Sequence, residues 1–356
     1  MVLSMIENEV TTAIGTPNIA LVKYWGKRNE KLNLPMNSSI SITLDENLNT
    51  KTSVMFTDKL ESDLLYINKE KQDINSLDSP EKLRFIKKTL EFMRNKSGFN
   101  KKALIVSENS FPTSSGIASS ASGGATLVFA LSSALNLHLS KREMSIIARQ
   151  ISGSACRSVY GGVVEWRKGK KIDGSDSYAK QVIEPDYWNE LRDIIAIVDG
   201  TKKKISSSLG HQATIATSTL YKARPKHADA EVKIIKEAIK RRDFQMMAEI
   251  IMKDSNNMHA TMLDTWPPIM YLNDNSKEII YAIHELNDKK NKYVAAYTFD
   301  AGANAHIITT ADYADDVFDV LKGISGIKST IQSGLGMGPK IKNNGSLIDV
   351  DKLGPK

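Results

Sequence analysis

Cysteine is almost absent from this sequence of 356 residues, which contains only Cys156. A single cysteine cannot form a disulfide bond within the chain, and it cannot hold an iron–sulfur cluster or a zinc site built from several cysteines. The six histidines are scattered and form no zinc-protease motif. This composition fits a reducing compartment, and we expect a cytoplasmic location.

Long apolar runs are also missing. No stretch reaches the roughly 18 apolar residues of a membrane-spanning helix, and the first residues, MVLSMIENEV, are too short and too acidic for a signal peptide. Hydrophobic residues make up 41% and charged residues 25%, which is ordinary for a globular protein and excludes disorder and collagen. The net charge of +7 suits an anionic partner, either nucleic acid, acidic lipid or a phosphorylated small molecule.

Strands and helices are expected in both halves of the chain, which predicts an α+β fold. The length fits about two domains, and we place them at 1–190 and 191–356. Ser140 and Glu143 form a capping-box pattern for a helix that ends near Ile151. Apolar periodicity predicts further helices, and short apolar runs predict strands. The expected helices span about 80–93, 116–135, 212–224, 228–242, 244–262, 275–288 and 312–322, and the main strands 103–108, 193–199, 294–299 and 306–310. The tail 334–356 is rich in Gly and Lys and is expected to be partly loose.

The segment 111–127, FPTSSGIASSASGGATL, places small residues before an apolar helical run. Small residues let a backbone approach a ligand closely, and the N-terminus of a helix favours phosphate. The hydroxyls of Ser119 and Ser120 can serve a phosphate or Mg²⁺. No GxxxxGK(S/T) motif is present, which excludes a Walker-type P-loop. The alternative is a tightly packed helix that binds nothing.

The segment 18–41 places Lys23, Lys27 and Arg28 around Tyr24 and Trp25 in an apolar stretch. Cations beside aromatic rings can hold a phosphate or stack on a base. The alternative is the edge of a strand with solvated lysines.

The segment 152–162, SGSACRSVYGG, combines serines, one arginine and glycines. Arg157 can hold a carboxylate or a phosphate through two parallel hydrogen bonds, which indicates an anion-binding loop. An ordinary turn with a surface arginine is the alternative. No sequence neighbour marks Cys156 as an activated nucleophile, so we interpret it as a packing residue.

Two further segments carry charge of opposite sign. In 202–212, KKKISSSLGHQ, a lysine run precedes three serines and a glycine, which suits either a phosphate or a solvated face. In 297–307, YTFDAGANAHI, Asp300 follows strand residues and precedes a turn of small residues. An acid at a strand end is a common catalytic base, and a turn-capping aspartate is the alternative. Together the five segments supply the functional groups that phosphoryl transfer needs, namely cations, hydroxyls and one carboxylate.

Several segments, in this order along the chain, resemble the diphosphomevalonate decarboxylase family of the GHMP kinase superfamily. The most specific are KYWGK, SGSACRS and YTFDAG, and the others are NIALVKYWGKRNEKLNLPMNSSISITL, FPTSSGIASSASGG, DSYAKQV and DSNNMHATMLDTWPPIMYLND. The resemblance covers about 15–310. It implies a two-lobed GHMP kinase fold with the active site in the cleft between the lobes. It also implies ATP and Mg²⁺ as cofactors, mevalonate 5-diphosphate as substrate, isopentenyl diphosphate as product, and a homodimer.

The resemblance also implies roles for individual residues. Asp300 matches the catalytic aspartate, Lys23 the lysine paired with it, and Arg157 the arginine that grips the substrate carboxylate. Ser120 matches the serine beside Mg²⁺ and the ATP phosphates. The remaining substrate-binding positions are Tyr24, Trp25, Gly26, Lys27, Lys82, Ser152, Gly153, Ser154, Ala155, Cys156 and Ser208. The nucleotide-binding positions are Ser107, Pro112, Ser115, Gly116, Ala118, Ser119 and Ser120.

This chain departs from the family pattern at a few positions. Ser114-Ser115 replaces Ala-Ala, Ile151 and Ala303 replace a glycine and a proline, and Lys82 stands where an arginine is expected. None of these changes removes a group that the chemistry needs. Three other functions stay open: a mevalonate 3-kinase-like enzyme, a monophosphate decarboxylase, and, from another class, a basic nucleic-acid-binding protein. Such a module needs a basic stripe with stacking aromatics, whereas these lysines are dispersed.

Overall fold

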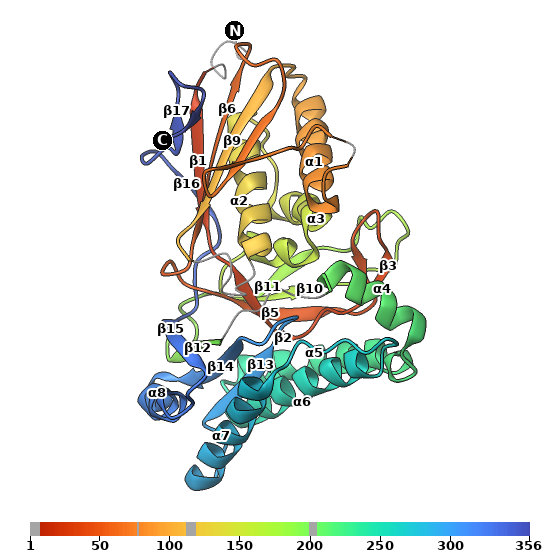
Figure 1. Ribbon diagram of the computed structural model, residues 1–356, viewed down its shortest axis with the longest axis vertical. Coiled ribbons are helices and arrows are strands. Elements are labelled where there is room, and N and C mark those ends of the chain that lie inside the picture. The colour runs from red at the N-terminus through yellow and green to blue at the C-terminus, as the bar shows by residue number, and fades with distance from the viewer. Residues whose placement is uncertain (1–7, 77, 112–118, 199–204) are drawn as a thin grey trace.

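The computed structural model describes residues 8–76, 78–111, 119–198 and 205–356, and it shows two lobes joined through a central sheet (Figure 1). The upper lobe in Figure 1 contains a six-stranded sheet in the order β16-β1-β6-β9-β7-β8. Its strands are β1 (Val10–Gly15), β6 (Thr50–Thr57), β7 (Leu64–Ile67), β8 (Glu70–Gln72), β9 (Lys102–Asn109) and β16 (Lys340–Lys342).

Three helices cover one face of this sheet. They are α1 (Glu81–Ser97), α2 (Ser119–Ala134) and α3 (Lys141–Ile151). Because side chains alternate along a strand, Val54 and Phe56 of β6 pack against these helices while Met55 points to the opposite face. The helix α3 begins with the predicted capping box, in which Ser140 accepts the N–H of Glu143 and the carboxylate of Glu143 accepts the N–H of Ser140. That prediction is confirmed.

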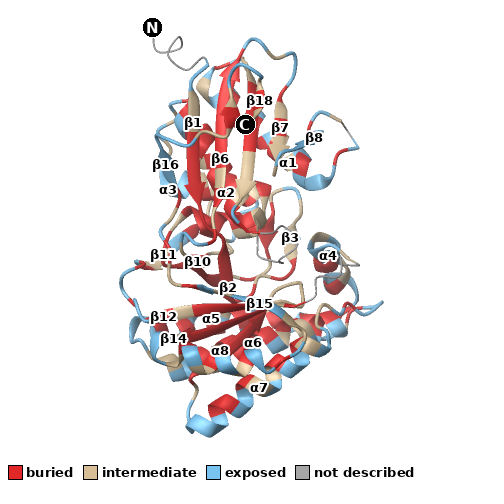
Figure 2. Cartoon of the chain, turned by 60° about the vertical axis from the view of Figure 1, so that its left-hand side comes forward, coloured by how far each residue is buried: buried red, intermediate tan, exposed pale blue. Residues whose placement is uncertain are grey.

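The central sheet has four strands in the order β11-β10-β5-β2. These strands are β2 (Asn18–Val22), β5 (Ser39–Thr43), β10 (Val163–Trp166) and β11 (Ala179–Ile183). A short hairpin, β3 (Lys27–Asn29) with β4 (Leu34–Pro35), projects beside it, and the 3₁₀ helix η3 (Gly153–Val159) links α3 to β10. Apolar residues of β2 and β5 belong to the same core as the lower lobe, so this sheet joins the two lobes (Figure 2).

The lower lobe contains a four-stranded sheet in the order β13-β14-β12-β15, packed against helices. Its strands are β12 (Leu191–Val198), β13 (Ala295–Phe299), β14 (Ala305–Thr310) and β15 (Ile327–Ser333). Its helices are α4 (Ser207–Thr217), α5 (Arg224–Lys240), α6 (Phe244–Leu263), α7 (Asp274–Lys290) and α8 (Ala314–Lys322), with the 3₁₀ turns η4 (Leu220–Lys222) and η5 (Ala311–Tyr313). The predicted 212–224 helix was misplaced, because the side chain of Ser206 caps α4, which begins at Ser207 and ends at Thr217.

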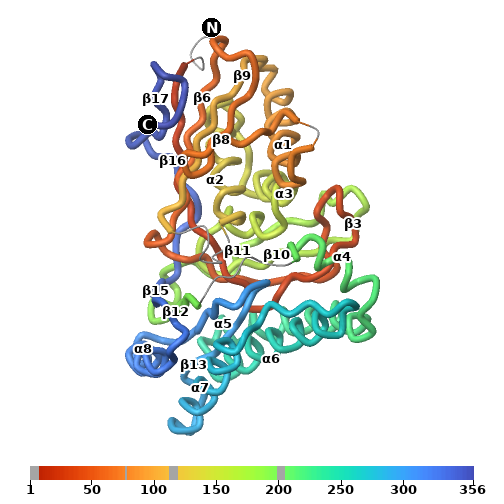
Figure 3. The backbone as a smooth tube through the Cα atoms, in the orientation of Figure 1, coloured from red at the N-terminus to blue at the C-terminus, as the bar shows by residue number. Residues whose placement is uncertain are grey.

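The C-terminal tail differs from the expectation of a partly loose segment. Its strand β16 pairs antiparallel with β1, so the chain returns from the lower lobe to the upper one (Figure 3). The last strands, β17 (Ile348–Asp349) and β18 (Gly354–Pro355), lie on the sheet face opposite the helices. There Ile348 is buried against Met55 and Leu104. Tertiary packing of a few apolar residues therefore orders a segment with no periodic pattern of its own.

Candidate active site

A cavity of about 290 Å³ lies where elements of both lobes meet. Its walls come from the end of β2, from α1, α2 and η3, and from α4, α6 and the turn after β13. Twelve residues that the sequence singled out line it: Lys23, Tyr24, Trp25, Lys27, Lys82, Ser120, Ser152, Gly153, Ser154, Arg157, Ser208 and Asp300. Segments that are far apart in the sequence thus form one polar and positively charged site.

The predicted acid and its predicted cationic partner are in direct contact. The ammonium of Lys23 donates a 2.7 Å hydrogen bond to Oδ1 of Asp300, although 277 residues separate the two. Lys23 is buried, with 2% of its side chain exposed, whereas the Asp300 side chain keeps 40% of its surface, which faces the cavity. The carboxylate is therefore anchored on one side and accessible to a ligand on the other.

Opposing effects set the pKa of Asp300. Loss of hydration on burial raises the pKa of this carboxyl. The charge and hydrogen bond of Lys23, together with smaller contributions from His306 and Arg157, lower the pKa by more. The net result is a pKa below the ordinary value of 3.8. Asp300 is ionised at neutral pH and is able to accept or orient a proton.

Arg157 is held rigidly at the base of the cavity. Its Nε donates to Asn18 (3.1 Å) and Ser41 (3.0 Å), and its Nη1 donates to Ser39 (2.6 Å). The two serines come from β5, where alternate residues face one side of the sheet, so the SSISIT pattern held a signal for them. Nη2 has no bonding partner among the described residues, and Arg157 lines the cavity. Its free edge suits a carboxylate.

The aromatic rings of Tyr24 and Trp25, which follow Lys23 in the sequence, form one wall of the cavity together with His211. His211 stacks on Trp25 with ring centroids 4.2 Å apart, and its Nδ1 accepts the N–H of Gly26 at 2.6 Å. Burial lowers the pKa of His211 to about 3, so the ring is neutral and carries its hydrogen on Nε2. Gly26 has a φ of +90°, and a Cβ there would lie 1.8 Å from the Tyr221 hydroxyl, which explains the glycine. The sequence did not single out His211.

Two polar atoms of this wall have no partner among the described residues, Oη of Tyr24 and Nε1 of Trp25. Burial raises the pKa of Tyr24 well above 10, so its hydroxyl stays protonated. Buried donors are normally paired, and both residues line the cavity. They are candidate donors to a bound anion.

A second cavity of about 140 Å³ adjoins the first, and Lys82 and Ile151 line both. It is mainly apolar, and it includes the predicted nucleotide-binding residues Ser107 and Ser119. Ser120 lines the first cavity, and its hydroxyl accepts a 3.5 Å hydrogen bond from Ser152. An apolar pocket beside a polar one suits a base next to its phosphates. The other predicted nucleotide-binding positions, Pro112, Ser115, Gly116 and Ala118, lie outside the described residues.

Replacement of Ser120 by alanine is expected to raise the KM for ATP. A hydroxyl that helps bind a phosphate or its metal contributes about 0.5–1.5 kcal/mol, or roughly a 2- to 13-fold change in KM. The measurement is the KM for ATP at several Mg²⁺ concentrations. The matched control is Ser122→Ala on the same helix, because Ser122 is buried and bonds Thr50 instead of facing a cavity. An unchanged response of Ser120→Ala to both ATP and Mg²⁺ would assign Ser120 to packing alone.

Three predicted substrate-binding residues do not line the cavity, namely Gly26, Ala155 and Cys156. Cys156 is fully buried against Val164 and Trp166, and burial raises the pKa of its thiol to about 12. A protonated thiol in an apolar environment is a poor nucleophile, in agreement with the packing role. These three residues pack behind the residues that line the cavity.

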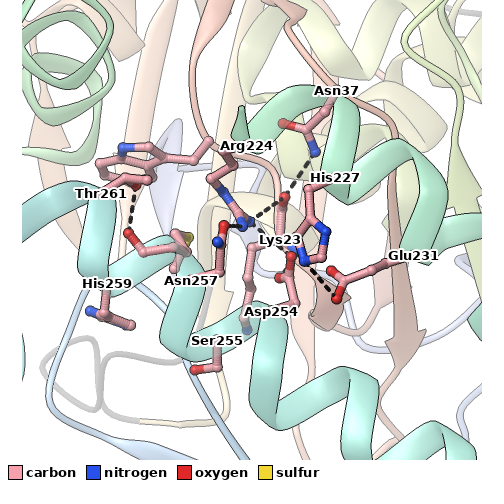
Figure 4. Close-up of polar contacts among 12 residues, drawn as sticks. Lys23, Asn37, Arg224, His227, Glu231, Asp254, Ser255, Asn257, His259 and Thr261 are labelled. Carbon is pink, nitrogen blue, oxygen red and sulfur yellow. Dashed lines mark hydrogen bonds and ion pairs between the residues drawn. The ribbon is translucent and has the colours of Figure 1, made fainter. Parts of the chain in front are cut away.

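A buried polar network lies beneath the cavity, and the sequence did not predict it (Figure 4). Asp254 of α6 accepts the N–H of Lys23 at 2.6 Å and pairs with Arg224 of α5 at 3.0 Å. Glu231, also on α5, contacts His227 at 3.0 Å and shares a side-chain hydrogen bond with Asp254. Burial, followed by the charge of Asp254, raises the pKa of Glu231 to about 8.

The raised pKa of Glu231 predicts a pH-dependent stability. The unfolded chain releases this proton near the ordinary value of 4.5, whereas the folded protein keeps it until about 8. The free energy of unfolding therefore falls as pH rises between these values, and Glu231→Gln removes this loss. We expect the variant to gain on the order of 3 kcal/mol over the wild type between about pH 5 and pH 8.

Urea unfolding of both proteins at the two pH values measures this gain. The control is Glu237→Gln on the same helix, because Glu237 is exposed and its pKa is lowered by Lys240. A Glu231→Gln effect that is equal at the two pH values would mean that Glu231 is already ionised in the folded protein.

Among the described residues, no helix is both long and apolar enough to cross a lipid bilayer. Within the same part of the chain, no group of three or more His, Cys, Asp or Glu side chains is arranged to hold a metal ion. Hydroxyls, amides and cations dominate the cavity instead.

Comparisons with known proteins agree with this architecture. Residues 15–179 match the family model of the diphosphomevalonate decarboxylase-like N-terminal domain, and residues 193–344 match that of the mevalonate 5-diphosphate decarboxylase C-terminal domain. The diphosphomevalonate decarboxylase of Gibberella zeae is 45% identical over 328 residues, which cover 87% of this chain and 85% of the relative.

Solved structures give the same result. A crystal structure of a mevalonate 5-diphosphate decarboxylase superimposes with a TM-score of 0.86 at 36% identity, covering 96% of this chain and 99% of the other. A structure of the protein MDDEF in complex with MVAPP, AMPPCP and magnesium has a TM-score of 0.84 at 32% identity, covering 94% and 99%.

The two lobes, the polar cavity where they meet and the likeness to these solved structures define a member of the GHMP kinase superfamily, which confirms the predicted α+β fold. Within it, the chain belongs to the diphosphomevalonate decarboxylase family, because family models match most of both lobes and relatives exceed 40% identity. The resemblance found in the sequence is thereby confirmed.

Proposed function

We propose that this protein catalyses the ATP-dependent decarboxylation of mevalonate 5-diphosphate to isopentenyl diphosphate, with release of ADP, phosphate and CO₂. This reaction belongs to the mevalonate pathway of isoprenoid biosynthesis. The observation that carries the proposal is the Lys23–Asp300 pair, which faces a cavity that also contains Arg157. A base, a cation for the moving phosphoryl group and a cation for a carboxylate are what the reaction needs.

In the first step Asp300 accepts the proton of the tertiary 3-hydroxyl as that oxygen forms a bond to the γ-phosphorus of ATP and the bond to ADP breaks. Lys23 keeps Asp300 ionised and offsets negative charge on the transferring group. Such transfer depends mainly on positioning and on charge neutralisation. Two anchored charges 2.7 Å apart are suited to both tasks.

In the second step the bond between the tertiary carbon and its phosphate breaks, and phosphate leaves. The bond to the carboxylate carbon then supplies the electron pair of the new double bond, and CO₂ departs. Arg157 holds the carboxylate through the guanidinium edge that its protein partners leave free. By fixing the carboxylate, Arg157 keeps the breaking bond aligned with the electron-poor carbon.

Other residues of the cavity suit the substrate diphosphate and the nucleotide. Tyr24 and Lys27, with Ser152, Ser154 and Ser208, offer hydroxyls and a cation for the diphosphate. Lys82 lies on the boundary between the two cavities and is able to reach either ligand.

The donor set also fits Mg²⁺, which MDDEF binds together with MVAPP and AMPPCP. This ion prefers phosphate oxygens and water to an all-protein cage, so the Ser120 hydroxyl is a sufficient protein ligand. Magnesium on the nucleotide phosphates would supply charge neutralisation during transfer.

We further propose that the protein is a homodimer and that it is located in the cytoplasm.

The test is to incubate the purified protein with ATP, Mg²⁺ and mevalonate 5-diphosphate, and in parallel with the monophosphate and with mevalonate. We expect CO₂ and isopentenyl diphosphate from the diphosphate alone. ADP formation without CO₂ would favour a 3-kinase, and CO₂ from the monophosphate would favour a monophosphate decarboxylase. A salt-sensitive gel shift with nucleic acid, and no turnover, would favour the binding module.

A further inference from the structure

Lys23 is the first residue after β2, at a point where that strand leaves the central sheet. The pairing of β2 with β5 shifts register between Ala20 and Val22 and ends there. The N–H and C=O of Lys23 therefore have no partner in the sheet, yet Lys23 is buried. Buried main-chain groups need other hydrogen-bond partners, and these partners decide where the lysine side chain begins.

Side chains from two helices and from the loop before β5 supply these partners (Figure 4). Asp254 of α6 accepts the Lys23 N–H at 2.6 Å. The Lys23 carbonyl accepts hydrogen bonds from Asn37, at 3.0 Å, and from Nη2 of Arg224 on α5, at 3.3 Å. Both ends of the residue are thus held by protein side chains.

These side chains also hold one another. Nη2 of Arg224 donates to Asp254 at 3.0 Å as well as to the Lys23 carbonyl, and its Nη1 donates to Asn257 at 2.6 Å. Neither side chain of the pair is exposed to solvent, and neither residue lines a cavity described above. A buried ion pair adds little stability compared with an apolar pair, because two charges lose their hydration. The pair therefore calls for an explanation other than stability.

We propose that Asp254 and Arg224 are positioning residues that fix the main chain of Lys23 and thereby hold its ammonium against Asp300. Neither touches a reactant, and both act through Lys23. This inference rests on the proposed function, because it assigns the pair to the step in which Asp300 accepts the 3-hydroxyl proton.

The consequence for Asp300 is electrostatic. The groups that face its carboxylate are Lys23 after β2, Arg157 on η3, His306 on β14 and His259 on α6. Burial lowers the pKa of His259 to about 4, so that ring is neutral near pH 7, and Lys23 makes the largest favourable contribution to the ionised carboxylate. Displacement of the Lys23 ammonium raises the pKa of Asp300 and leaves other charges in place.

The decisive variant is Asp254→Asn. The amide has one acceptor oxygen, so either the Lys23 N–H or Arg224 faces an NH₂ group and loses its acceptor. We expect the rate of CO₂ release to fall about 10- to 100-fold, with the KM values for ATP and mevalonate 5-diphosphate changed less than about threefold. The acidic limb of the pH–rate profile should move to higher pH by about one unit.

The chain offers a closely matched control in the upper lobe. Asp63 accepts the N–H of Ala103 at 2.8 Å and pairs with Arg94 at 2.7 Å, so it repeats the geometry of Asp254 away from the cavities. Asp63→Asn should lower stability without moving the acidic limb. If Asp254→Asn does not fold, Arg224→Lys keeps the charge but loses the double contact, and the same shift is expected of it.

A double-variant comparison separates positioning from a general loss of structure. If Asp254 acts through Lys23, adding Asp254→Asn to Lys23→Met should lower the residual rate less than about twofold. A full effect in the Lys23→Met background, or a wild-type acidic limb in the folded Asp254→Asn protein, would overturn the proposal. Failure of the wild type to release CO₂ would instead overturn the proposed function, so the two failures are distinguishable.

Discussion

Asp300→Asn is expected to lower the rate of CO₂ release by at least about 10²–10⁴-fold, the usual contribution of a general base. Asparagine has nearly the same shape, so the turn after β13 should persist. The variant loses the negative charge and the basic oxygen, and the 3-hydroxyl then has no acceptor for its proton. The measurement is CO₂ release by the variant, with ATP and substrate binding followed separately.

Substrate binding should survive in this variant, because the groups proposed to contact the diphosphate come from other elements. Lys23 loses its counter-charge, so the two residues should act as a unit. We expect Lys23→Met combined with Asp300→Asn to cost less than the sum of the single changes. A folded Asp300→Asn protein with near-native CO₂ release would mean that the base is a different residue.

Arg157→Ala is expected to reduce kcat/KM for mevalonate 5-diphosphate by about 10- to 150-fold, which corresponds to about 1.5–3 kcal/mol for a lost charge-assisted contact. The reason is the free guanidinium edge in the cavity, which alanine cannot replace. Steady-state kinetics with each substrate varied in turn measures the effect. The KM for ATP should change little.

Because Arg157 also bonds buried partners, its loss is expected to affect stability as well. Arg149→Ala is the matched control, since Arg149 is equally buried but bonds only the main-chain carbonyls of Leu32, Gly174 and Ser177. It should lower stability without a selective effect on the substrate. An equal loss of kcat/KM for mevalonate 5-diphosphate in the two variants would mean that Arg157 does not bind the substrate carboxylate.

Local features of the fold could be predicted because they are determined by residues that are close together in the sequence. The capping box at Ser140 and Glu143 is complete within four positions, and α6, predicted at 244–262, spans Phe244–Leu263. Both depend on contacts within a few turns of helix.

The C-terminal tail shows the limit of such local patterns. The residues that order it, Leu347, Ile348 and Leu353, are too few for a period, and their partners lie in β6 and β9. Only the folded upper lobe supplies those partners.

The individual residues of the site could be predicted from the sequence, but their arrangement in space could not. Lys23 and Asp300 each stood in a suggestive segment, but only the fold brings them to 2.7 Å. Composition alone left a non-functional alternative open for each segment, such as a strand edge with solvated lysines around Lys23 or a turn-capping role for Asp300, and the family resemblance supplied the pairing. Arg224 carried no signal of its own, and Asp254 opens the family segment DSNNMHATMLDTWPPIMYLND but was given no role. A charge on a helix is usually solvated, and the burial of these two side chains depends on how α5 and α6 pack.

The most direct test of the proposed function is the stoichiometry of a single reaction. Purified protein, ATP and Mg²⁺ are mixed with mevalonate 5-diphosphate labelled in its carboxyl carbon, and ADP and labelled CO₂ are counted together. We expect equal amounts of ADP, CO₂ and isopentenyl diphosphate throughout the time course. ADP that accumulates with a stable 3-phosphorylated product and no CO₂ would contradict the decarboxylase assignment.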